Sequence, residues 1–239
     1  MFRVIDLFVQ NQFLVMKLPL ILINFKCYEA GTGENALKLA KICESVSKKY
    51  DKNIAIAPQF TDILLISREV SIPIFSQHID PIEPGAFTGH VSPSSIKKAG
   101  VIGTLINHSE RKLTLEEIDK RVKIAKKYGL ITVCCSGDIE ESKTIAKFNP
   151  DFIAYEPPEL IGTGISVSQT KPEVVTKTIN EIKKINSNIE VLCGAGITNG
   201  GDVKKALELG TVGVLVASGV VKAENPENVL VDFVESVKQ

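Results

Sequence analysis

The sequence has 239 residues, 44% of them hydrophobic, and it carries 28 basic and 28 acidic side chains, so its net charge is zero. This length and apolar content allow a sizeable core. Without a basic excess, a nucleic-acid or anionic-membrane partner has no electrostatic support. The five cysteines are odd in number and lack CxxC spacing, which is typical of free thiols in a reducing cytosol. We therefore expect a cytoplasmic protein.

The N-terminal segment, residues 1–15, is apolar but is broken by charged and amide side chains. It has no uninterrupted apolar core and no small-residue cleavage site, so it does not predict a signal peptide. It is also too short to span a membrane. Met16-Lys17-Leu18-Pro19 then looks like a second beginning of the chain. We expect residues 1–15 to be a dispensable extension.

Short apolar runs alternate with amphipathic stretches from residue 20 onward. Most runs are continuously apolar, which is typical of parallel strands buried on both faces. The expected strands are residues 20–25, 53–57, 72–79, 101–107, 130–135, 151–156, 189–194 and 212–217.

The intervals between these runs carry helix signals. Thr114 followed by Glu117 predicts a capping box, and Gly129 predicts the end of that helix. Asn225-Pro226 predicts the start of the last helix. Helix-compatible segments also occupy residues 34–49, 61–69, 93–99, 139–147, 171–185 and 199–209.

Eight strand–helix units follow one another without a linker or a shift in composition. This pattern favours one α/β domain over residues 16–239, a (βα)8 barrel of eight parallel strands ringed by helices. An open doubly wound sheet is the alternative, because the pattern alone does not fix closure. Either architecture places chemistry at the carboxyl ends of the strands.

Polar side chains stand at three of these strand ends. Asn24 and Lys26 close the first run, His108 follows the fourth, and Glu156 ends the sixth. A carboxylate base opposite an imidazole donor is suited to moving a proton beside a carbonyl. Taken singly, each side chain has an ordinary role, as a solvated charge, a hydrogen-bonded histidine or a helix cap. Convergence on one barrel mouth would make them a site.

Glycine-containing turns follow the last three runs, at residues 162–164, 194–197 and 217–219. Small residues let backbone N–H groups approach an anion closely, and a helix N-terminus adds a favourable dipole. Barrels commonly build a phosphate site from the loops after the seventh and eighth strands. One such turn is weak evidence, since turns need glycine anyway. Three in succession favour a phosphorylated substrate.

Six segments carry a more specific signal: "NFK" at 24–26, "GAFTGHVSP" at 85–93, "NHSERK" at 107–112, "AYEPPELIGTG" at 154–164, "CGAGI" at 193–197 and "LVASG" at 215–219. In this order they resemble the triosephosphate isomerase family, and the resemblance runs from about Leu18 to the C-terminus. The short length resembles its archaeal branch, in which tetramers are common. The resemblance implies a catalytic barrel that interconverts dihydroxyacetone phosphate and D-glyceraldehyde 3-phosphate, in glycolysis and gluconeogenesis, without a cofactor or metal.

The resemblance also implies a role for each candidate residue. Glu156 would be the base that moves protons between two carbons, and His108 the electrophile that polarises the carbonyl. Lys26 would stabilise the enediolate and, with Asn24, bind substrate oxygens. The phosphate ligands would come from the late loops: Ile161, Gly162, Gly196, Ala217 and Ser218.

The segment after Glu156 resembles the family's closing lid. Pro157-Pro158 would stiffen one hinge, and Gly162 and Gly164 would loosen the other. The lid would exclude water from the reactive intermediate.

Two positions depart from the common family pattern. Gly196 stands where a serine is usual, and Ala217-Ser218 replace a glycine pair. Backbone N–H groups survive both changes. We therefore expect phosphate binding to be kept, with an effect on affinity and not on reaction type.

The loop at 85–90 resembles the family's interdigitating loop, which would carry Thr88 towards a neighbouring subunit's site. This implies a homo-oligomer, at least a dimer, with a tetramer favoured.

Two other functions stay open. One is another phosphate-barrel enzyme, a sugar-phosphate epimerase or a lyase. An epimerase would need metal ligands, and His78, His90 and His108 show no ligand spacing; a Schiff-base lyase would need a lysine where Glu156 stands. The other is a non-catalytic sugar-phosphate binding barrel. Such a barrel would tolerate loss of Lys26, His108 or Glu156, but all three are present.

Overall fold

The fold is a closed parallel barrel, seen in a computed structural model that describes residues 4–9, 12–157, 164 and 166–237. Within these residues the main sheet has eight strands: β3 (Leu20–Asn24), β4 (Asn53–Ala57), β5 (Phe75–Ser76), β6 (Gly103–Ile106), β7 (Ile131–Ser136), β8 (Phe152–Tyr155), β9 (Glu190–Cys193) and β10 (Gly213–Val216). Each strand pairs in parallel with its neighbours, in the order β4-β3-β10-β9-β8-β7-β6-β5.

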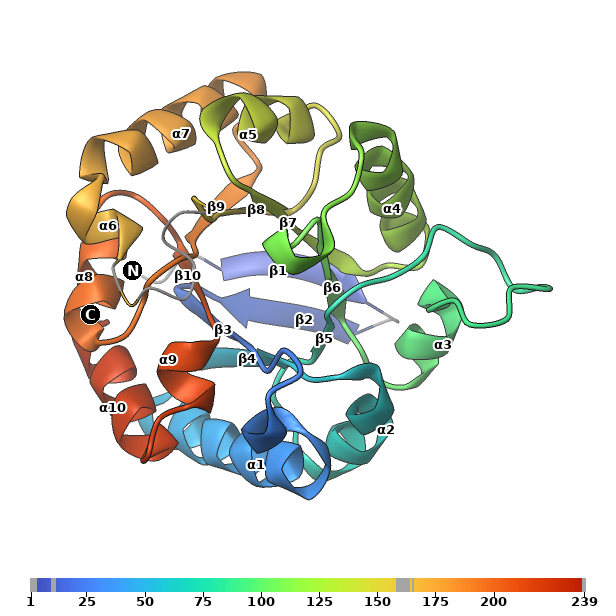
Figure 1. Ribbon diagram of the computed structural model, residues 1–239, viewed down its shortest axis with the longest axis horizontal. Coiled ribbons are helices and arrows are strands. Elements are labelled where there is room, and N and C mark those ends of the chain that lie inside the picture. The colour runs from blue at the N-terminus through green and yellow to red at the C-terminus, as the bar shows by residue number, and fades with distance from the viewer. Residues whose placement is uncertain (1–3, 10–11, 158–163, 165, 238–239) are drawn as a thin grey trace.

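A backbone contact between β4 and β5 closes the barrel. Ile56 and Ile74 form a parallel bridge, and the N–H of Ile56 donates to the carbonyl of Pro73 at 3.0 Å. Closure brings all strand ends to one mouth (Figure 1). The barrel prediction is therefore confirmed, and the open doubly wound sheet is excluded.

Helices ring the sheet (Figure 1). The α-helices are α1 (Gly33–Tyr50), α2 (Phe60–Glu69), α3 (Pro93–Lys98), α4 (Leu115–Lys127), α5 (Ile139–Ala146), α6 (Val167–Thr170), α7 (Pro172–Ile185), α8 (Gly200–Glu208), α9 (Ser218–Val221) and α10 (Pro226–Ser236). Two 3₁₀ turns, η1 (Glu29–Gly31) and η2 (Ser109–Arg111), follow β3 and β6. Among the described residues, no helix is long and apolar enough to cross a membrane.

The predicted helix caps are confirmed. Thr114 accepts a hydrogen bond from the N–H of Glu117, whose side chain accepts in return from the N–H of Thr114, so the capping box is complete. Asn225 accepts from the N–H of Asn228 ahead of the proline at the first position of α10. These caps satisfy N–H groups that have no partner inside the helix. Short polar motifs thus mark the helix starts correctly.

Strand residues alternate between two apolar cores. Leu20 and Leu22 point into the barrel, and Ile21 and Ile23 pack against the helices. Burial of a side chain of this size contributes about 1.5–3 kcal/mol. Phe75 fills the barrel interior beside β6, where a Cβ on Gly103 would lie 2.3 Å from the Phe75 ring. The continuous apolar runs of the sequence therefore reflect burial on both faces.

The strand expected at 72–79 is much shorter than predicted. β5 covers only Phe75–Ser76, with the single bridge at Ile74 before it. Pro73 has no N–H for a sheet ladder. After Ser76 the chain leaves the sheet, and the Gln77 amide hydrogen-bonds the carbonyls of Lys26 and Ala57 instead.

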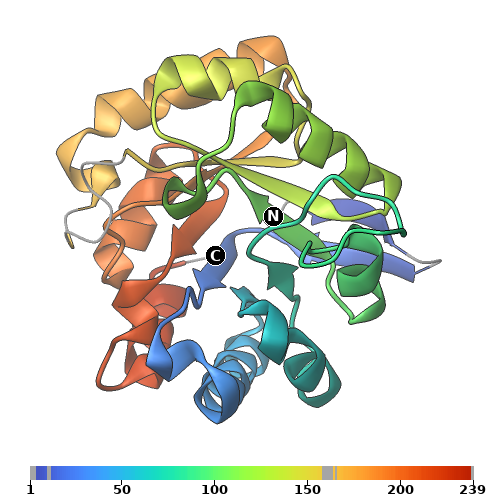
Figure 2. The ribbon, with the colours of Figure 1, turned by 45° about the vertical axis from the view of Figure 1, so that its right-hand side comes forward.

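The N-terminal segment contains a hairpin that the sequence analysis did not predict. β1 (Val4–Val9) pairs antiparallel with β2 (Gln12–Lys17), as a sheet separate from the barrel. Figures 1 and 2 place it at the end of the barrel where the strands begin, away from the mouth. Its apolar residues do not alternate with polar ones, so no strand was predicted from this part of the sequence.

We propose that this hairpin is dispensable, because a two-stranded hairpin is marginally stable by itself and its strands pair only with each other in the described sheets. A protein that begins at Met16 keeps Leu18, which belongs to the barrel interior. It should retain wild-type kcat and a similar Tm, measured by steady-state kinetics and thermal melting. A large loss of either would show that the hairpin supports the barrel.

Candidate active site

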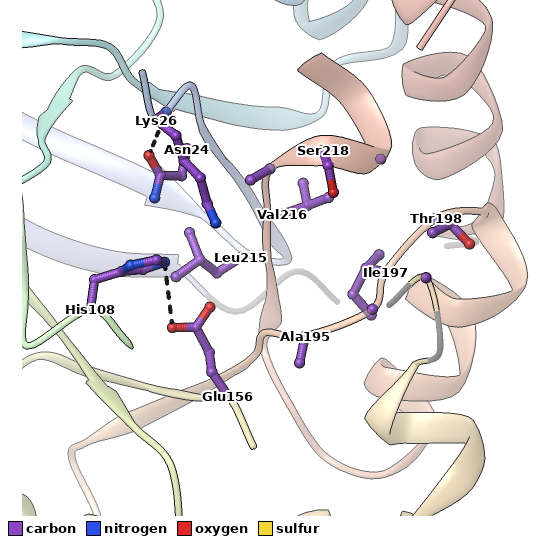
Figure 3. Close-up of a pocket in the computed structure, with 14 residues that line it drawn as sticks. Asn24, Lys26, His108, Glu156, Ala195, Ile197, Thr198, Leu215, Val216 and Ser218 are labelled. Atoms are coloured by element: carbon purple, nitrogen blue, oxygen red, sulfur yellow. Dashed lines mark hydrogen bonds and ion pairs between the residues drawn. The ribbon is translucent and has the colours of Figure 1, made fainter. Parts of the chain in front are cut away.

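One pocket lies at the carboxyl ends of the strands (Figure 3). Side chains after β3, β6 and β8 line one part of it, and the loops after β9 and β10 line the rest. Its lining includes Asn24, Lys26, His108, Glu156, Gly164, Ala195, Gly196, Ile197, Thr198, Ala217, Ser218 and Gly219. All predicted site residues in the described part of the chain therefore lie together. Ile161 and Gly162 lie outside the described residues, as does most of the predicted lid.

Glu156 is buried with one carboxylate oxygen unused. Its side chain follows β8, and its N–H donates to the carbonyl of Ser136 at 2.8 Å. Oε2 has no hydrogen-bond partner among the described residues and lies 4.0 Å from Nε2 of His108 (Figure 3). Buried polar atoms are normally hydrogen-bonded. An open, buried oxygen facing a pocket is suited to accept a proton from a bound molecule.

The Cys135 thiol interacts with Glu156. Burial raises the pKa of Cys135 well above its ordinary value, and the charge of Glu156 and a hydrogen bond with it act in the same direction. The thiol therefore stays protonated and serves as a donor to the carboxylate. This contact from β7 helps to hold Glu156, while its Oε2 stays without a partner among the described residues.

The His108 ring is oriented by the turn that follows it. Its Nδ1 accepts the N–H of Glu110 at 3.2 Å, so the proton of the neutral ring belongs on Nε2. Nε2 faces Glu156 across the pocket. A donor opposite an acceptor is the arrangement needed to polarise a carbonyl while a neighbouring carbon loses a proton.

Lys26 is held in a left-handed backbone conformation, with φ +50°. Its N–H donates to Oδ1 of Asn24 at 2.9 Å, and its carbonyl accepts from Nε2 of Gln77 at 2.9 Å. Nζ donates to Oε1 of Glu110 at 2.8 Å. Strained backbone conformations persist where surrounding contacts impose them. Here the contacts aim a cation at the pocket.

The loop after β9 presents backbone to the pocket. Ala195 and Gly196 both have positive φ, +89° and +74°. Successive residues in such turns can direct N–H groups to one point and favour an anion. Glycine at 196 also avoids the strain that serine would meet at this φ.

The loops after β9 and β10 touch directly. A Cβ on Gly219 would lie 2.5 Å from the carbonyl oxygen of Ile197. α9 starts at Ser218, and the first N–H groups of a helix have no acceptor within it. The Thr198 hydroxyl is engaged with Asp202 at 3.1 Å. Backbone N–H groups, rather than this hydroxyl, are therefore the donors available to an anion.

Glu110 and Cys135 belong to the site although the sequence did not predict them. Gly194 was predicted as part of a phosphate-binding turn, but the structure places it against Glu156. Glu110 lies inside the quoted "NHSERK" segment, but nothing local indicates that it reaches Lys26. Cys135 lies in the strand expected at 130–135, and its contact with Glu156 crosses between strands. Such contacts depend on barrel geometry, which periodicity does not encode.

A second buried polar cluster lies outside the pocket. Nε2 of His78 is 3.0 Å from Oδ1 of Asp80, and Arg121 is 3.3 Å from the same oxygen. Burial lowers the pKa of His78, although Asp80 opposes this shift. Asp80 also accepts the N–H of Val91 at 2.8 Å and so closes the base of the loop between them. In the described part of the chain, no group of three or more potential metal ligands occurs.

Gly194 leaves the space that Glu156 occupies. A Cβ at 194 would lie 2.4 Å from Cγ and 2.9 Å from Oε1 of Glu156. The residue has no positive φ, so alanine is excluded by space alone.

Gly194→Ala should therefore displace the carboxylate. Since a misplacement of about 1 Å can lower a rate on the order of 100-fold, we expect such a fall in the kcat of the isomerisation that the sequence predicts. Steady-state kinetics, with Tm as the control for folding, measures it. A kcat within about twofold of wild type would show that Glu156 needs no such space.

Comparison with known proteins agrees with this geometry. The family model described as "Triosephosphate isomerase" matches residues 19–237. The triosephosphate isomerase of Methanobacterium bryantii is 50% identical over 93% of this chain and 99% of its own length. That of Methanosarcina acetivorans is 50% identical over 92% and 99%, and that of Methanocaldococcus jannaschii is 49% identical over 91% and 100%. The chain belongs to the triosephosphate isomerase family.

Proposed function

We propose that the chain catalyses the interconversion of dihydroxyacetone phosphate and D-glyceraldehyde 3-phosphate. The observation that carries this proposal is the open Oε2 of Glu156, 4.0 Å from Nε2 of His108 in one pocket. The names of the relatives support it. Glycolysis and gluconeogenesis are the expected context, and buried thiols such as Cys43 and Cys193 fit a reducing cytoplasm.

The reaction needs two proton transfers at adjacent carbons. Glu156 takes a proton from the CH₂OH carbon of the ketone, the C–H electron pair forms a C=C bond, and the carbonyl electrons move onto oxygen. Nε2 of His108 and the ammonium of Lys26 stabilise the enediolate charge. The hydroxyl proton on the first carbon moves to the oxygen of the former carbonyl, and Glu156 returns its proton to the former carbonyl carbon, so that the first carbon becomes the aldehyde. These steps require neither a redox cofactor nor a metal.

The phosphate group belongs at the other side of the pocket. The backbone of Gly196 and the start of α9 at Ala217 and Ser218 would hold it, together with Ile161 and Gly162 of the lid. Binding energy from the phosphate then orients the reacting carbons beside Glu156. The triose phosphates are accordingly the proposed small-molecule partners.

The other candidate functions have less support. The relatives' names favour isomerisation over a sugar-phosphate epimerase or lyase. A binding barrel has no need of a buried carboxylate oxygen without a partner, whose burial lowers stability.

Removal of the base should lower kcat and leave KM almost unchanged, since the phosphate contacts persist. Glu156→Asp withdraws the carboxylate by about 1 Å, which can cost on the order of 100-fold. Glu156→Gln should cost more, because general-base catalysis contributes about 100- to 10,000-fold. A coupled assay with glyceraldehyde 3-phosphate measures both variants. Retention of more than about a tenth of wild-type kcat by Glu156→Gln would disprove its role as base.

We also propose a homo-oligomer built through the loop between Asp80 and Val91. The loop projects from the barrel (Figure 1). Phe87, one of its residues, is 45% exposed. A hollow of about 430 Å³ adjoins the active site, and its lining includes Lys26, Tyr28 and Gln77. The loop of one subunit would enter this hollow of its neighbour and so carry Thr88 towards the neighbour's active site. The resemblance to the archaeal branch favours a tetramer over a dimer.

Light scattering at micromolar concentration should give a mass at least twice 26.0 kDa. Phe87→Glu should shift the protein towards monomer and lower its kcat, because a charge replaces an exposed apolar side chain of the loop. A monomeric wild-type protein with full turnover would refute the proposal.

A further inference from the structure

Asn107, the residue before His108, has an unusual backbone conformation. Its φ is +61°, in the left-handed region that few non-glycine residues adopt. It is 1% exposed, and it lines neither of the two hollows described above. Its burial and conformation therefore serve something other than direct contact with substrate.

The Asn107 amide is fully engaged. Nδ2 donates to the carbonyl of Cys135 and to Oε1 of Glu141, both at 2.9 Å. Oδ1 accepts the N–H of Leu113 at 2.9 Å. The turn at residues 108–112 is thus tied at its start and its end to β7 and α5. His108 and Glu110 both lie on this turn.

Glu141 fastens the same turn a second time. Nζ of Lys112 donates to its two carboxylate oxygens at 2.7 and 3.0 Å, and the N–H of Gly137 donates at 2.7 Å. Burial opposes ionisation, but the hydrogen bonds from Gly137, Lys112 and Asn107 outweigh it and hold the pKa of Glu141 below its ordinary value. A carboxylate thus joins Asn107 to Lys112 across the turn.

We propose that Asn107 and Glu141 are positioning residues that hold the His108 ring towards Glu156. The inference rests on the proposed role of His108 as the electrophile. Because the chain is fixed immediately before and after the turn, the ring has a defined direction, and Nε2 stays 4.0 Å from Oε2 of Glu156. Neither residue lines the pocket, so their effect on the reaction is indirect, and the turn that they fasten carries His108.

A double-mutant cycle with Asn107→Gly and His108→Gln tests this coupling. Glycine adopts a positive φ without strain, so Asn107→Gly removes the amide contacts and leaves the turn conformation accessible. We expect kcat to fall on the order of tenfold to a hundredfold, as for other small misplacements. The inhibition constant for inorganic phosphate should change by less than about twofold, because its ligands lie elsewhere. In the His108→Gln background, Asn107→Gly should have little further effect.

Asn149→Gly is the matched control. Asn149 also has a positive φ, +59°, but it is exposed on the loop between α5 and β8, where it accepts a hydrogen bond from Asn186 at 2.6 Å. Its kcat should equal that of the wild type. Glu141→Gln, which is nearly isosteric, supplies the same cycle should Asn107→Gly fail to fold.

Additive losses in the double variant would overturn the inference, since they would indicate a general structural role. So would a kcat for Asn107→Gly within about twofold of wild type while His108→Gln is impaired. Wild-type kcat in His108→Gln would instead overturn the role of His108 itself, and the inference with it.

Discussion

The site is arranged around a buried carboxylate that lacks one hydrogen-bond donor. Glu156 is 6% exposed, and no described residue donates to its Oε2. Leaving a buried polar atom without a partner costs about 1–3 kcal/mol, and more for a charged group. The oxygen without a partner therefore lowers the stability of the folded protein. In return, the oxygen keeps its lone pairs for a proton of the bound substrate.

Holding such an oxygen in place requires contacts from several strands. The Cys135 thiol supports Glu156 from β7, and the missing side chain of Gly194 leaves room beside β9. Of the five described non-glycine residues with positive φ, Lys26, Asn107 and Ala195 lie at strand ends around the pocket. Strain of this kind tends to gather at functional sites, where surrounding structure maintains it. Barrel closure makes these separate strand ends one surface.

The sequence predicted the barrel and its helix caps because both depend on local patterns. Continuous apolar runs identify buried parallel strands, and motifs such as Thr114 with Glu117 mark helix starts. The short helices α6 and α9 were missed, since such brief elements leave little periodicity. The N-terminal hairpin was missed because its apolar residues do not alternate with polar ones, and β5 proved shorter than the strand predicted at 72–79. The roles of Glu110 and Asn107, and the contact of Gly194 with Glu156, were missed for another reason. Their partners are distant in sequence, and only the closed barrel brings them together.

Isomerisation of dihydroxyacetone phosphate in D₂O tests the central claim most directly. If Glu156 removes a carbon-bound proton and later returns one, the acid form can exchange with solvent between the two steps. Proton NMR of the product should then show deuterium at carbon 2 in a measurable fraction of molecules, and Glu156→Gln should form almost none of this product. Formation of the product by Glu156→Gln at close to the wild-type rate would contradict proton transfer through the Glu156 carboxylate.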